Sequence, residues 1–194
     1  MDLHPLEFYN ANARQYAEQT MALDVSHLYD KFFPHLPAGV HILDVGCGSG
    51  RDSLHFINQG YKVTAFDGSS EIVAQANATL PIKAKVMLFD DMDFTPKSFD
   101  GIWACASLLH LMPEELPEIL TKLRTFLKDD GVFFCSFKLG EGLRTDSRGR
   151  RFLDVTEEGL RKVLEECGYG GIDVFTNDGV GGEVWVNGVG VSLK

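Results

Sequence analysis

The sequence predicts a doubly wound α/β domain with a mostly parallel seven-stranded sheet, an antiparallel C-terminal hairpin and helices on both faces. From residue 41 onward, short apolar runs alternate with helical stretches, which is typical of right-handed strand–helix–strand units. The last two apolar runs have no long helix between them, so the final strands are expected to pair as a hairpin. At 194 residues the chain is expected to form a single domain, residues 1–194.

The elements are expected in the following order along the chain. Two N-terminal helices are predicted at 6–19 and 26–33. Strands are predicted at 41–45, 62–66, 85–89, 99–106, 132–137, 172–176 and 183–192. Between them, helices are predicted at 52–59, 71–79, 113–128 and 157–167. Thr156 is expected to cap the last helix and Gly168 to end it, and 129–131 reads as a turn.

Composition and charge narrow the classes of partner. The formal net charge is −10, so the chain should repel nucleic acid and anionic membranes, and a small molecule is the expected partner. One short basic segment, 144–151, is the exception. The first twenty residues carry several charges and no long apolar core, so neither a signal peptide nor a membrane anchor is expected.

The cysteines and histidines predict the compartment and argue against a metal. The four cysteines lie far apart, make no C-x-x-C pair, and have no cluster of histidines beside them. We interpret all four as reduced thiols of a cytoplasmic protein and expect no metal site. The oligomeric state is not indicated by any pattern in the sequence.

The glycine-rich turn in "HILDVGCGSGRDS", residues 41–53, is the main functional signal. In doubly wound sheets, ligands bind outside the carboxyl ends of the strands, and this turn follows the first strand. Gly46, Gly48 and Gly50 allow positive φ angles and let a ligand contact the backbone. A tight turn that holds no ligand is the alternative.

The residues around the turn distinguish between possible ligands. The spacing is G-x-G-x-G, whereas a dinucleotide fingerprint would place its third glycine where Arg51 stands. The next strand ends at Asp67, where an acid accepts hydrogen bonds from the hydroxyls of a ribose. Asp44 and Asp52 would repel a pyrophosphate but suit an ammonium group. A ligand with ribose and ammonium but no phosphate indicates S-adenosylmethionine.

Two further strand ends are expected at the same edge of the sheet. Asp90 or Asp91 could accept a hydrogen bond from the adenine amine, with Met92 packed on the ring, although a solvated loop is the alternative. The fourth strand carries the small residues Ala104, Ala106 and Ser107 toward this edge, and they would leave room for the methionine arm.

Together, "LDVGCGSGRDS", "VTAFDGS", "FDGIWACASLLHL" and "VWVN" resemble the class I S-adenosylmethionine-dependent methyltransferases, and are similar to their small bacterial tellurite-resistance-type branch. The resemblance implies a Rossmann-like methyltransferase fold, with residues 1–36 as a helical lid. It implies that S-adenosyl-L-methionine is the cofactor. The cofactor-binding residues it nominates are Tyr16, Asp44, Gly46, Cys47, Gly48, Asp67, Gly68, Ser69, Asp90, Asp91, Met92 and Ala106.

The substrate side is less defined. Tyr9 of the lid, Arg51, and Arg144 and Arg148 of a predicted loop are the candidate acceptor-binding residues, the arginines being suited to an anion. Glu183 precedes Trp185, where the resemblance would lead us to expect a basic residue. His110 is the candidate general base, with simple packing as its alternative.

The expected reaction is in-line methyl transfer to a small molecule, for which the protein chiefly supplies orientation. Two alternatives remain open. One is a protein that binds or senses S-adenosylmethionine without turnover, and the other is a dinucleotide-dependent oxidoreductase. The identity of the acceptor is not indicated by the sequence.

Overall fold

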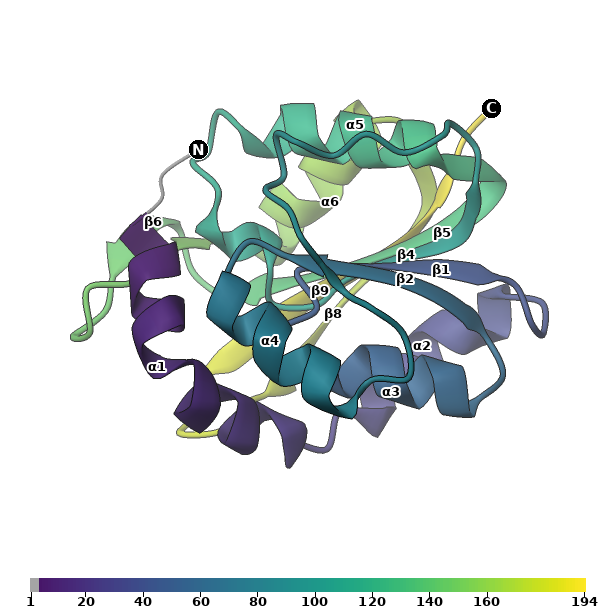
Figure 1. Ribbon diagram of the computed structural model, residues 1–194. Helices are drawn as coiled ribbons and strands as arrows, with labels where there is room; N and C mark the ends of the chain where they lie inside the picture. Colours follow the sequence, from purple (N-terminus) through teal and green to yellow (C-terminus); the bar gives the residue numbers. More distant parts are fainter. Residues whose placement is uncertain (1–3) are drawn as a thin grey trace.

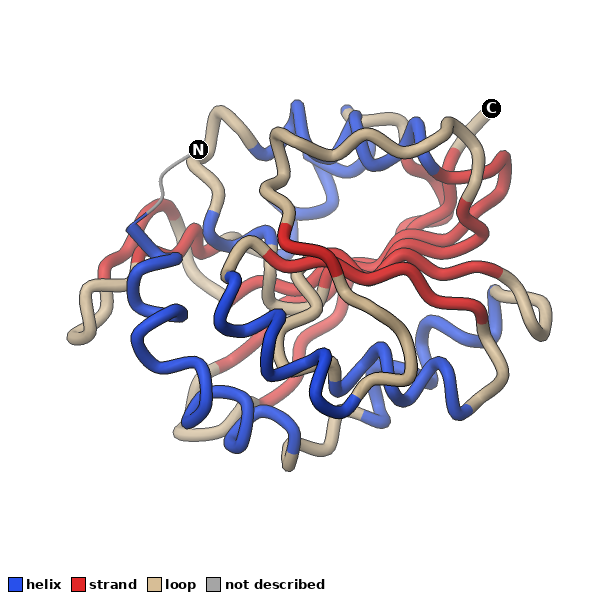
Figure 2. The backbone as a smooth tube through the Cα atoms, in the orientation of Figure 1, coloured by secondary structure: helices blue, strands red, loops and turns tan. Residues whose placement is uncertain are grey.

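The computed structural model describes residues 4–194 and has one central twisted sheet flanked by helices (Figures 1 and 2). The strand order is β3-β2-β1-β4-β5-β9-β8. The sheet strands are β1 (His41–Val45), β2 (Lys62–Asp67), β3 (Lys85–Val86), β4 (Phe99–Ala104), β5 (Leu127–Lys138), β8 (Tyr169–Asp178) and β9 (Val184–Ser192). All neighbours from β3 to β5 pair in parallel, whereas β9 pairs antiparallel with both β5 and β8. The predicted fold class is confirmed.

Helices cover both faces of the sheet (Figure 1). The helices are α1 (His4–Met21), α2 (Ser26–Phe32), α3 (Arg51–Asn58), α4 (Ser70–Thr79), α5 (Leu116–Phe126) and α6 (Glu157–Glu166), with short 3-10 turns η1 (Phe33–His35) and η2 (Leu108–His110). On one face lie α5 and α6, on the other α2, α3 and α4, and α1 lies across the carboxyl ends of the strands. Residues 1–3 of the predicted lid lie outside the described residues.

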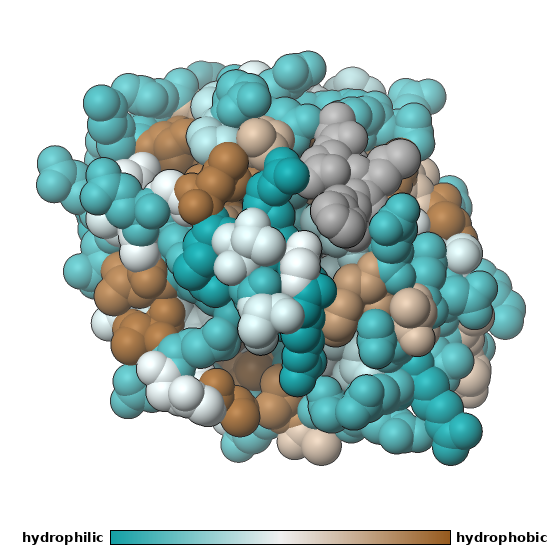
Figure 3. Space-filling model, turned by 90° about the vertical axis from the view of Figure 1, so that its left-hand side faces the viewer, coloured by the Kyte–Doolittle hydropathy of each residue, from teal (hydrophilic) through white to brown (hydrophobic). Residues whose placement is uncertain are grey.

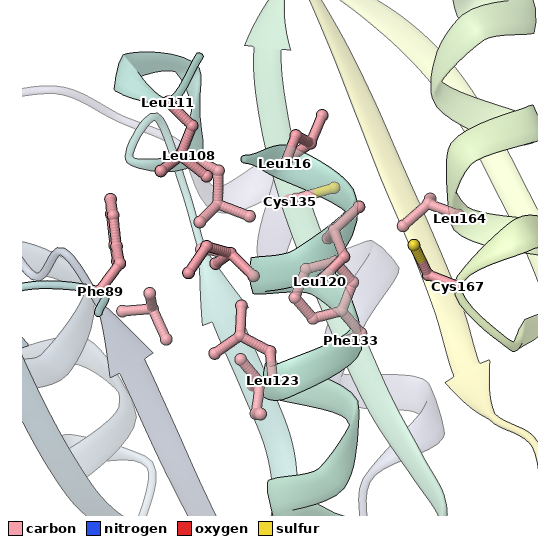
Figure 4. Close-up of a cluster of buried hydrophobic side chains, with 14 of the residues drawn as sticks. Phe89, Leu108, Leu111, Leu116, Leu120, Leu123, Phe133, Cys135, Leu164 and Cys167 are labelled. Atoms are coloured by element: carbon pink, nitrogen blue, oxygen red, sulfur yellow. The ribbon is translucent and has the colours of Figure 1, made fainter. Parts of the chain in front are cut away.

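Each face of the sheet has its own apolar core. The core beneath α5 contains Leu116, Leu120 and Leu123, packed against Phe133 and Cys135 of β5 (Figure 4). The opposite core is aromatic: the rings of Trp103 and Phe134 stack with centroids 3.9 Å apart. Because both faces are buried, the central strands carry apolar residues on both faces rather than alternating, as is usual for parallel sheets.

Local signals in the sequence account for several helix ends. Thr156 caps α6, its side chain accepting a hydrogen bond from Gly159 N at 3.0 Å, as predicted. Gly168 follows α6 with φ of 85°, also as predicted. Ser69 caps α4 by accepting from Ile72 N at 3.1 Å. These side chains satisfy N–H groups that a helix leaves unpaired in its first turn.

Three predicted segments differ from the structure. The sequence predicts a loop at 140–152, but most of this segment belongs to a hairpin of β6 (Gly142–Thr145) and β7 (Arg151–Asp154). Asp146 closes that hairpin, because its carboxylate accepts from the backbone N–H groups of Arg148 and Arg150, each at 2.9 Å. The predicted turn at 129–131 is an irregularity within β5, where Asp130 has φ of 62°. The strand predicted at 85–89 ends at Val86.

None of the helices in residues 4–194 combines the length and the apolar content that crossing a bilayer requires.

Candidate functional site

A cavity of about 630 Å³ lies at the carboxyl ends of the strands, beneath α1. Figure 3 shows the face of the molecule that carries these strand ends, where apolar side chains lie between hydrophilic ones around a recess. We distinguish two parts of the cavity. The glycine-turn half is lined by residues at the ends of β1, β2 and β4, such as Gly46, Asp67 and Ala106. The hairpin half, named after the β6–β7 hairpin, is lined by residues of β5, β7 and β9, such as Lys138, Phe152 and Asn187.

The glycine turn forms the floor of its half. Gly46 has φ of 71°, and a Cβ there would lie 2.5 Å from Cβ of Ser107, so no larger residue fits without movement. Gly48 has φ of 54°, and a Cβ there would lie 3.7 Å from the Tyr16 ring. Tyr16 of helix α1 therefore lies directly over the turn. Gly46, Cys47, Gly48 and Tyr16 all line the cavity.

Asp67 ends β2 and faces the cavity beside Gly68. One carboxylate oxygen accepts from Gly48 N at 3.0 Å, and the other accepts from Ser69 N at 2.9 Å. Burial raises the pKa of Asp67, and these backbone N–H groups oppose that rise. Each oxygen can accept one more hydrogen bond, so the carboxylate is held in place and can still receive a pair of hydroxyls.

The third predicted group, Asp90, Asp91 and Met92, does not line the cavity. Asp90 and Asp91 are exposed, and Met92 is buried in the core beneath α5. The residues just before them, Met87, Leu88 and Phe89, line the cavity instead and give it an apolar wall. The apolar run "VMLF" could have predicted this wall. Apolar side chains can pack on a flat ligand ring, whereas an acid can only accept hydrogen bonds from its edge.

The acids next to the turn form a buried network at the start of α3. Asp52 accepts from Arg51 Nε at 2.6 Å, Tyr29 Oη at 2.6 Å and Trp103 Nε1 at 2.8 Å. Asp44 accepts from Ser53 Oγ at 2.6 Å, and burial together with the nearby Asp52 raises the pKa of its carboxyl above the usual range. Arg51 and Asp52 line the cavity, whereas Asp44 lies behind the turn.

The end of β4 connects the two halves of the cavity. Ala106 has φ of 52°, an unusual conformation for a residue with a side chain and one that clusters at functional sites. Its N–H donates to Ser136 Oγ at 2.8 Å, which ties β4 to β5. Among residues 4–194, Ser107 Oγ is buried and has no hydrogen-bond partner, although it lines the cavity. This buried hydroxyl is available to a bound molecule.

Helix α1 contacts the hairpin half through Tyr9. The Tyr9 hydroxyl lies 2.9 Å from His110 Nε2, and His110 Nδ1 lies 2.9 Å from the Arg151 carbonyl oxygen. A carbonyl can only accept, so Nδ1 carries the proton and Nε2 accepts from Tyr9. Burial, helped by the nearby charges of Arg150 and Lys138, lowers the pKa of His110 to about 4. Burial raises the pKa of Tyr9 to about 12.

The predicted arginines are placed differently from one another. Arg144 lies outside the cavity lining and pairs with Asp154 at 2.6 Å. Arg148 is exposed and lines a second, smaller cavity against α1. Arg150, a third arginine of the same basic segment and one that could equally clamp an anion, lines the cavity and pairs with Asp146 at 2.8 Å. The closed hairpin thus turns one arginine inward and the other two outward.

The hairpin half contains residues that the sequence did not predict for the site, among them Lys138 and Asn187. Lys138 is buried at the end of β5, pairs with Glu183, and has Nζ 4.5 Å from the centre of the Phe152 ring. Asn187 is fully buried in β9 and also lines the cavity. A lysine ending the apolar run "VFFCSFK" was a usable signal. Asn187 had none, because its role depends on pairing between distant strands.

No group of three or more histidine, cysteine, aspartate or glutamate side chains suited to a metal ion occurs within residues 4–194.

Residues 42–131 match a family model described as a methyltransferase domain. An uncharacterized methyltransferase of Staphylococcus carnosus is 28% identical over 123 residues, which cover 60% of this chain and 59% of the relative. A ubiquinone biosynthesis O-methyltransferase of Xanthomonas campestris is 32% identical over 104 residues, covering 50% of this chain and 43% of the relative. The chain spans about half the length of the curated relatives it matches.

Solved structures show the same fold along nearly the whole chain. A methyltransferase structure from Methanosarcina mazei has a TM-score of 0.72 and 21% identity, and covers 88% of this chain and 99% of that one. The 1,6-didemethyltoxoflavin-N1-methyltransferase of Burkholderia thailandensis, with bound 1,6-didemethyltoxoflavin and S-adenosylhomocysteine, has a TM-score of 0.70 and 21% identity, covering 100% and 93%. The fold is therefore that of the class I S-adenosylmethionine-dependent methyltransferases. The narrower tellurite-resistance-type assignment stays a prediction.

Proposed function

We propose that this chain, which has the class I methyltransferase fold, is an enzyme that transfers a methyl group from S-adenosylmethionine to a small molecule. The observation that carries the proposal is the Asp67 carboxylate, fixed by Gly48 N and Ser69 N at the wall of a cavity floored by the glycine turn. This arrangement matches a ligand that presents two neighbouring hydroxyls and an extended arm without phosphate. The match of residues 42–131 to a methyltransferase domain supports it.

The cofactor is S-adenosylmethionine, and the glycine-turn half offers a place for each of its parts. Gly46, Cys47 and Gly48 would hold the methionine arm, with Tyr16 closing over it. Asp67 would accept from the ribose hydroxyls, and Leu88 and Phe89 would pack on adenine. Gly68 would lie beneath the ribose, and Ser69 would act indirectly, because its N–H holds Asp67.

Charge in the cavity supports the same ligand. Five carboxylates contribute to its lining, from Asp24, Asp52, Asp67, Asp178 and Glu183, against three basic side chains, from Arg51, Lys138 and Arg150. A lining with excess negative charge favours a ligand with a net positive charge. S-adenosylmethionine, which carries a sulfonium, an ammonium and a carboxylate, fits that requirement.

When bound, the cofactor supplies a methyl group activated by a positively charged sulfur, which becomes a neutral thioether after transfer. The residues of this chain have to orient the acceptor in line with that methyl and keep water out. Ala106 and Ser107 lie at the junction of the two halves, where donor and acceptor would meet. The lid residues Tyr9 and Tyr16, whose ring centroids are 5.0 Å apart, cover this junction.

We propose that His110 takes up the proton of an acceptor that arrives protonated, with Tyr9 as the intervening group. His110 Nδ1 donates to the Arg151 carbonyl oxygen, so Nε2 carries a lone pair. That lone pair accepts the hydrogen bond from the Tyr9 hydroxyl and could take its proton. A pKa of about 4 makes His110 a weak base at neutral pH. The proton would therefore leave only as the new bond to the methyl carbon forms.

A methyl-transfer assay tests the proposal. The full chain is incubated with S-adenosylmethionine carrying a labelled methyl group and with a panel of small hydroxyl, amine and thiol compounds. Label transferred to one of them supports the enzyme, and the Asp67→Ala variant should abolish the transfer at the same cofactor concentration. Tight cofactor binding without transfer to any acceptor would instead favour a protein that binds or senses S-adenosylmethionine.

The cysteines agree with the predicted compartment. Cys47, Cys105, Cys135 and Cys167 are all free thiols. Free cysteines are usual in reducing compartments, so we propose a cytoplasmic enzyme.

A further inference from the structure

Asn187 carries a buried hydrogen-bond acceptor without a partner. The residue is 0% exposed, and within residues 4–194 no group bonds to its Oδ1. Its Nδ2 donates to Asn177 Oδ1 at 2.7 Å and contacts the Phe175 carbonyl oxygen at 3.3 Å. Buried polar atoms in folded proteins nearly always have a partner, so an orphan acceptor on a cavity wall indicates a missing donor.

The orientation of this amide is fixed by its neighbours. Asn177 Nδ2 donates to the Asp178 carbonyl oxygen at 3.0 Å, so Asn177 presents its oxygen to Asn187. The Phe175 carbonyl can also only accept. Both contacts therefore require the nitrogen of Asn187, and a flipped amide would place oxygen against oxygen. The unpartnered atom is an acceptor, which calls for an N–H or O–H group in the ligand.

Strand order places Asn187 away from the cofactor. Asn187 pairs in register with Ser136 of β5, and Ser136 Oγ binds the Ala106 N–H beyond β4. Neighbouring strands are about 4.8 Å apart, so β9 lies about 10 Å from β4 and about 14 Å from β1. The glycine turn follows β1, so the methionine arm held there stays out of reach of Asn187. The hydrogen-bond donor that Asn187 Oδ1 lacks therefore belongs to the molecule that receives the methyl group.

The charged groups of the cavity indicate that the molecule that receives the methyl group is neutral. Each basic side chain in its described lining already has a carboxylate partner: Arg51 pairs with Asp52, Lys138 with Glu183, and Arg150 with Asp146. An anionic acceptor would have to break one of these pairs in a cavity with more carboxylates than cations. The carboxamide of Asn187 is itself neutral.

Trp185 suggests the shape of the acceptor. Residues 185 and 187 are two apart in β9, so their side chains leave the strand on the same side, and both line the cavity. Gly179 lies so close that a Cβ there would be 2.3 Å from Trp185 Nε1, so the segment before β9 packs against the indole. A flat aromatic surface next to a fixed hydrogen-bond acceptor suits a planar ring that carries its donor in the ring plane.

We propose that the methyl acceptor is a neutral, planar aromatic or heteroaromatic compound that donates an N–H or O–H hydrogen bond to Asn187 Oδ1 while its ring packs on Trp185. The proposal rests on the proposed function, because it assigns the hairpin half of the cavity to the acceptor. It makes Asn187 a specificity-determining residue that contacts the acceptor and leaves cofactor binding alone.

The test uses matched probes that differ only in the donor. The pairs are indole with 1-methylindole and 2-quinolone with 1-methyl-2-quinolone, and benzoate serves as the anionic probe. Binding to the full chain saturated with S-adenosylhomocysteine is followed by ligand-observed NMR at millimolar probe concentration. In the wild type, the N–H members should bind roughly tenfold more tightly than their N-methyl partners, and benzoate should bind most weakly.

Variants assign the preference to one atom. Asn187→Leu has a similar volume and no acceptor, so the N–H preference should disappear while affinity for S-adenosylhomocysteine is unchanged. Asn58→Leu, the same change at an exposed position of α3, is the matched control and should behave as the wild type. If Asn187→Leu fails to fold, Asn187→Ser takes its place, because its hydroxyl is too short to reach the same position.

The outcomes separate the two proposals. If the chain does not bind S-adenosylhomocysteine, the proposed function fails. If it binds S-adenosylhomocysteine but the N-methyl compounds or benzoate bind as well as the N–H compounds, or no neutral aromatic probe binds, the assignment of the acceptor class is overturned. A donor preference that survives in a folded Asn187 variant would overturn the role of Asn187.

Discussion

The two halves of the cavity are built in different ways. In the glycine-turn half, backbone atoms close to one motif do most of the work: Gly48 N and Ser69 N hold Asp67, and Gly46 fits against Ser107. In the hairpin half, side chains from distant segments meet, as Lys138 and Glu183 do. Backbone-built sites leave a spacing pattern in the sequence, whereas sites built from distant side chains do not. The cofactor is thus easier to predict than the acceptor.

The largest loss of stability is expected at Gly46, where the turn leaves no space for a side chain. Gly46→Ala should lower the free energy of unfolding by about 2 to 5 kcal/mol, because alanine is strained at φ of 71° and its Cβ would meet Ser107. Urea unfolding of the variant measures this. Gly60→Ala is the matched control, since Gly60 has φ of 87° but no atom within 4 Å, and should cost only about 1 to 2 kcal/mol. Equal losses in the two variants would mean that Ser107 does not restrict the turn.

Asp67→Ala should reduce affinity for S-adenosylhomocysteine by about 2 to 4 kcal/mol, since two hydrogen bonds to a charged group would be lost. Calorimetric titration of the variant gives the value. Asp93→Ala removes an exposed carboxylate outside the cavity lining and should leave the affinity unchanged. An Asp67→Ala protein that binds as tightly as the wild type would show that the ribose lies elsewhere.

The contrast between the halves also explains how far the sequence could predict the molecule. Alternating apolar runs and helices predicted the sheet, and β1 was predicted residue for residue at His41–Val45. The β6–β7 hairpin was not predicted, because its turn is closed by hydrogen bonds that the backbone N–H groups of Arg148 and Arg150 donate to Asp146, and an apolar pattern does not reveal such bonds. Asn187 was missed because its partner Asn177 lies on another strand, which only the paired sheet brings alongside.

A smaller effect is expected from pH at the contact between the lid and the hairpin half. Burial lowers the pKa of His110 from 6.5 to about 4, so between these values the unfolded chain binds more protons and stability falls as the pH drops. Comparing urea unfolding near pH 7 and near pH 5 should show that His110→Gln removes about 2 kcal/mol of this loss. If the variant and the wild type lose the same stability on acidification, His110 is not held neutral by burial.

The smallest effect is expected at Arg148. It was predicted to bind the acceptor, but it lies outside the lining of the cavity, so Arg148→Ala should change kcat/KM for any acceptor found by less than about 0.5 kcal/mol. Arg150 is two residues further along the chain and lines the cavity, over the Phe8 and Phe152 rings. Arg150→Ala should therefore reduce kcat/KM more than Arg148→Ala does. A larger loss in Arg148→Ala than in Arg150→Ala would mean that the hairpin turns over when the acceptor binds.

The central claim is that the glycine-turn half holds S-adenosylmethionine, and calorimetric titration of the wild-type chain tests it most directly. S-adenosylhomocysteine and NAD are titrated separately into the same preparation. We expect micromolar binding of S-adenosylhomocysteine and no comparable binding of NAD, because Asp52 and Asp67 line the cavity beside a turn that lacks the dinucleotide spacing. Tighter binding of NAD would contradict the assignment of the cofactor and, with it, the methyl-transfer reaction.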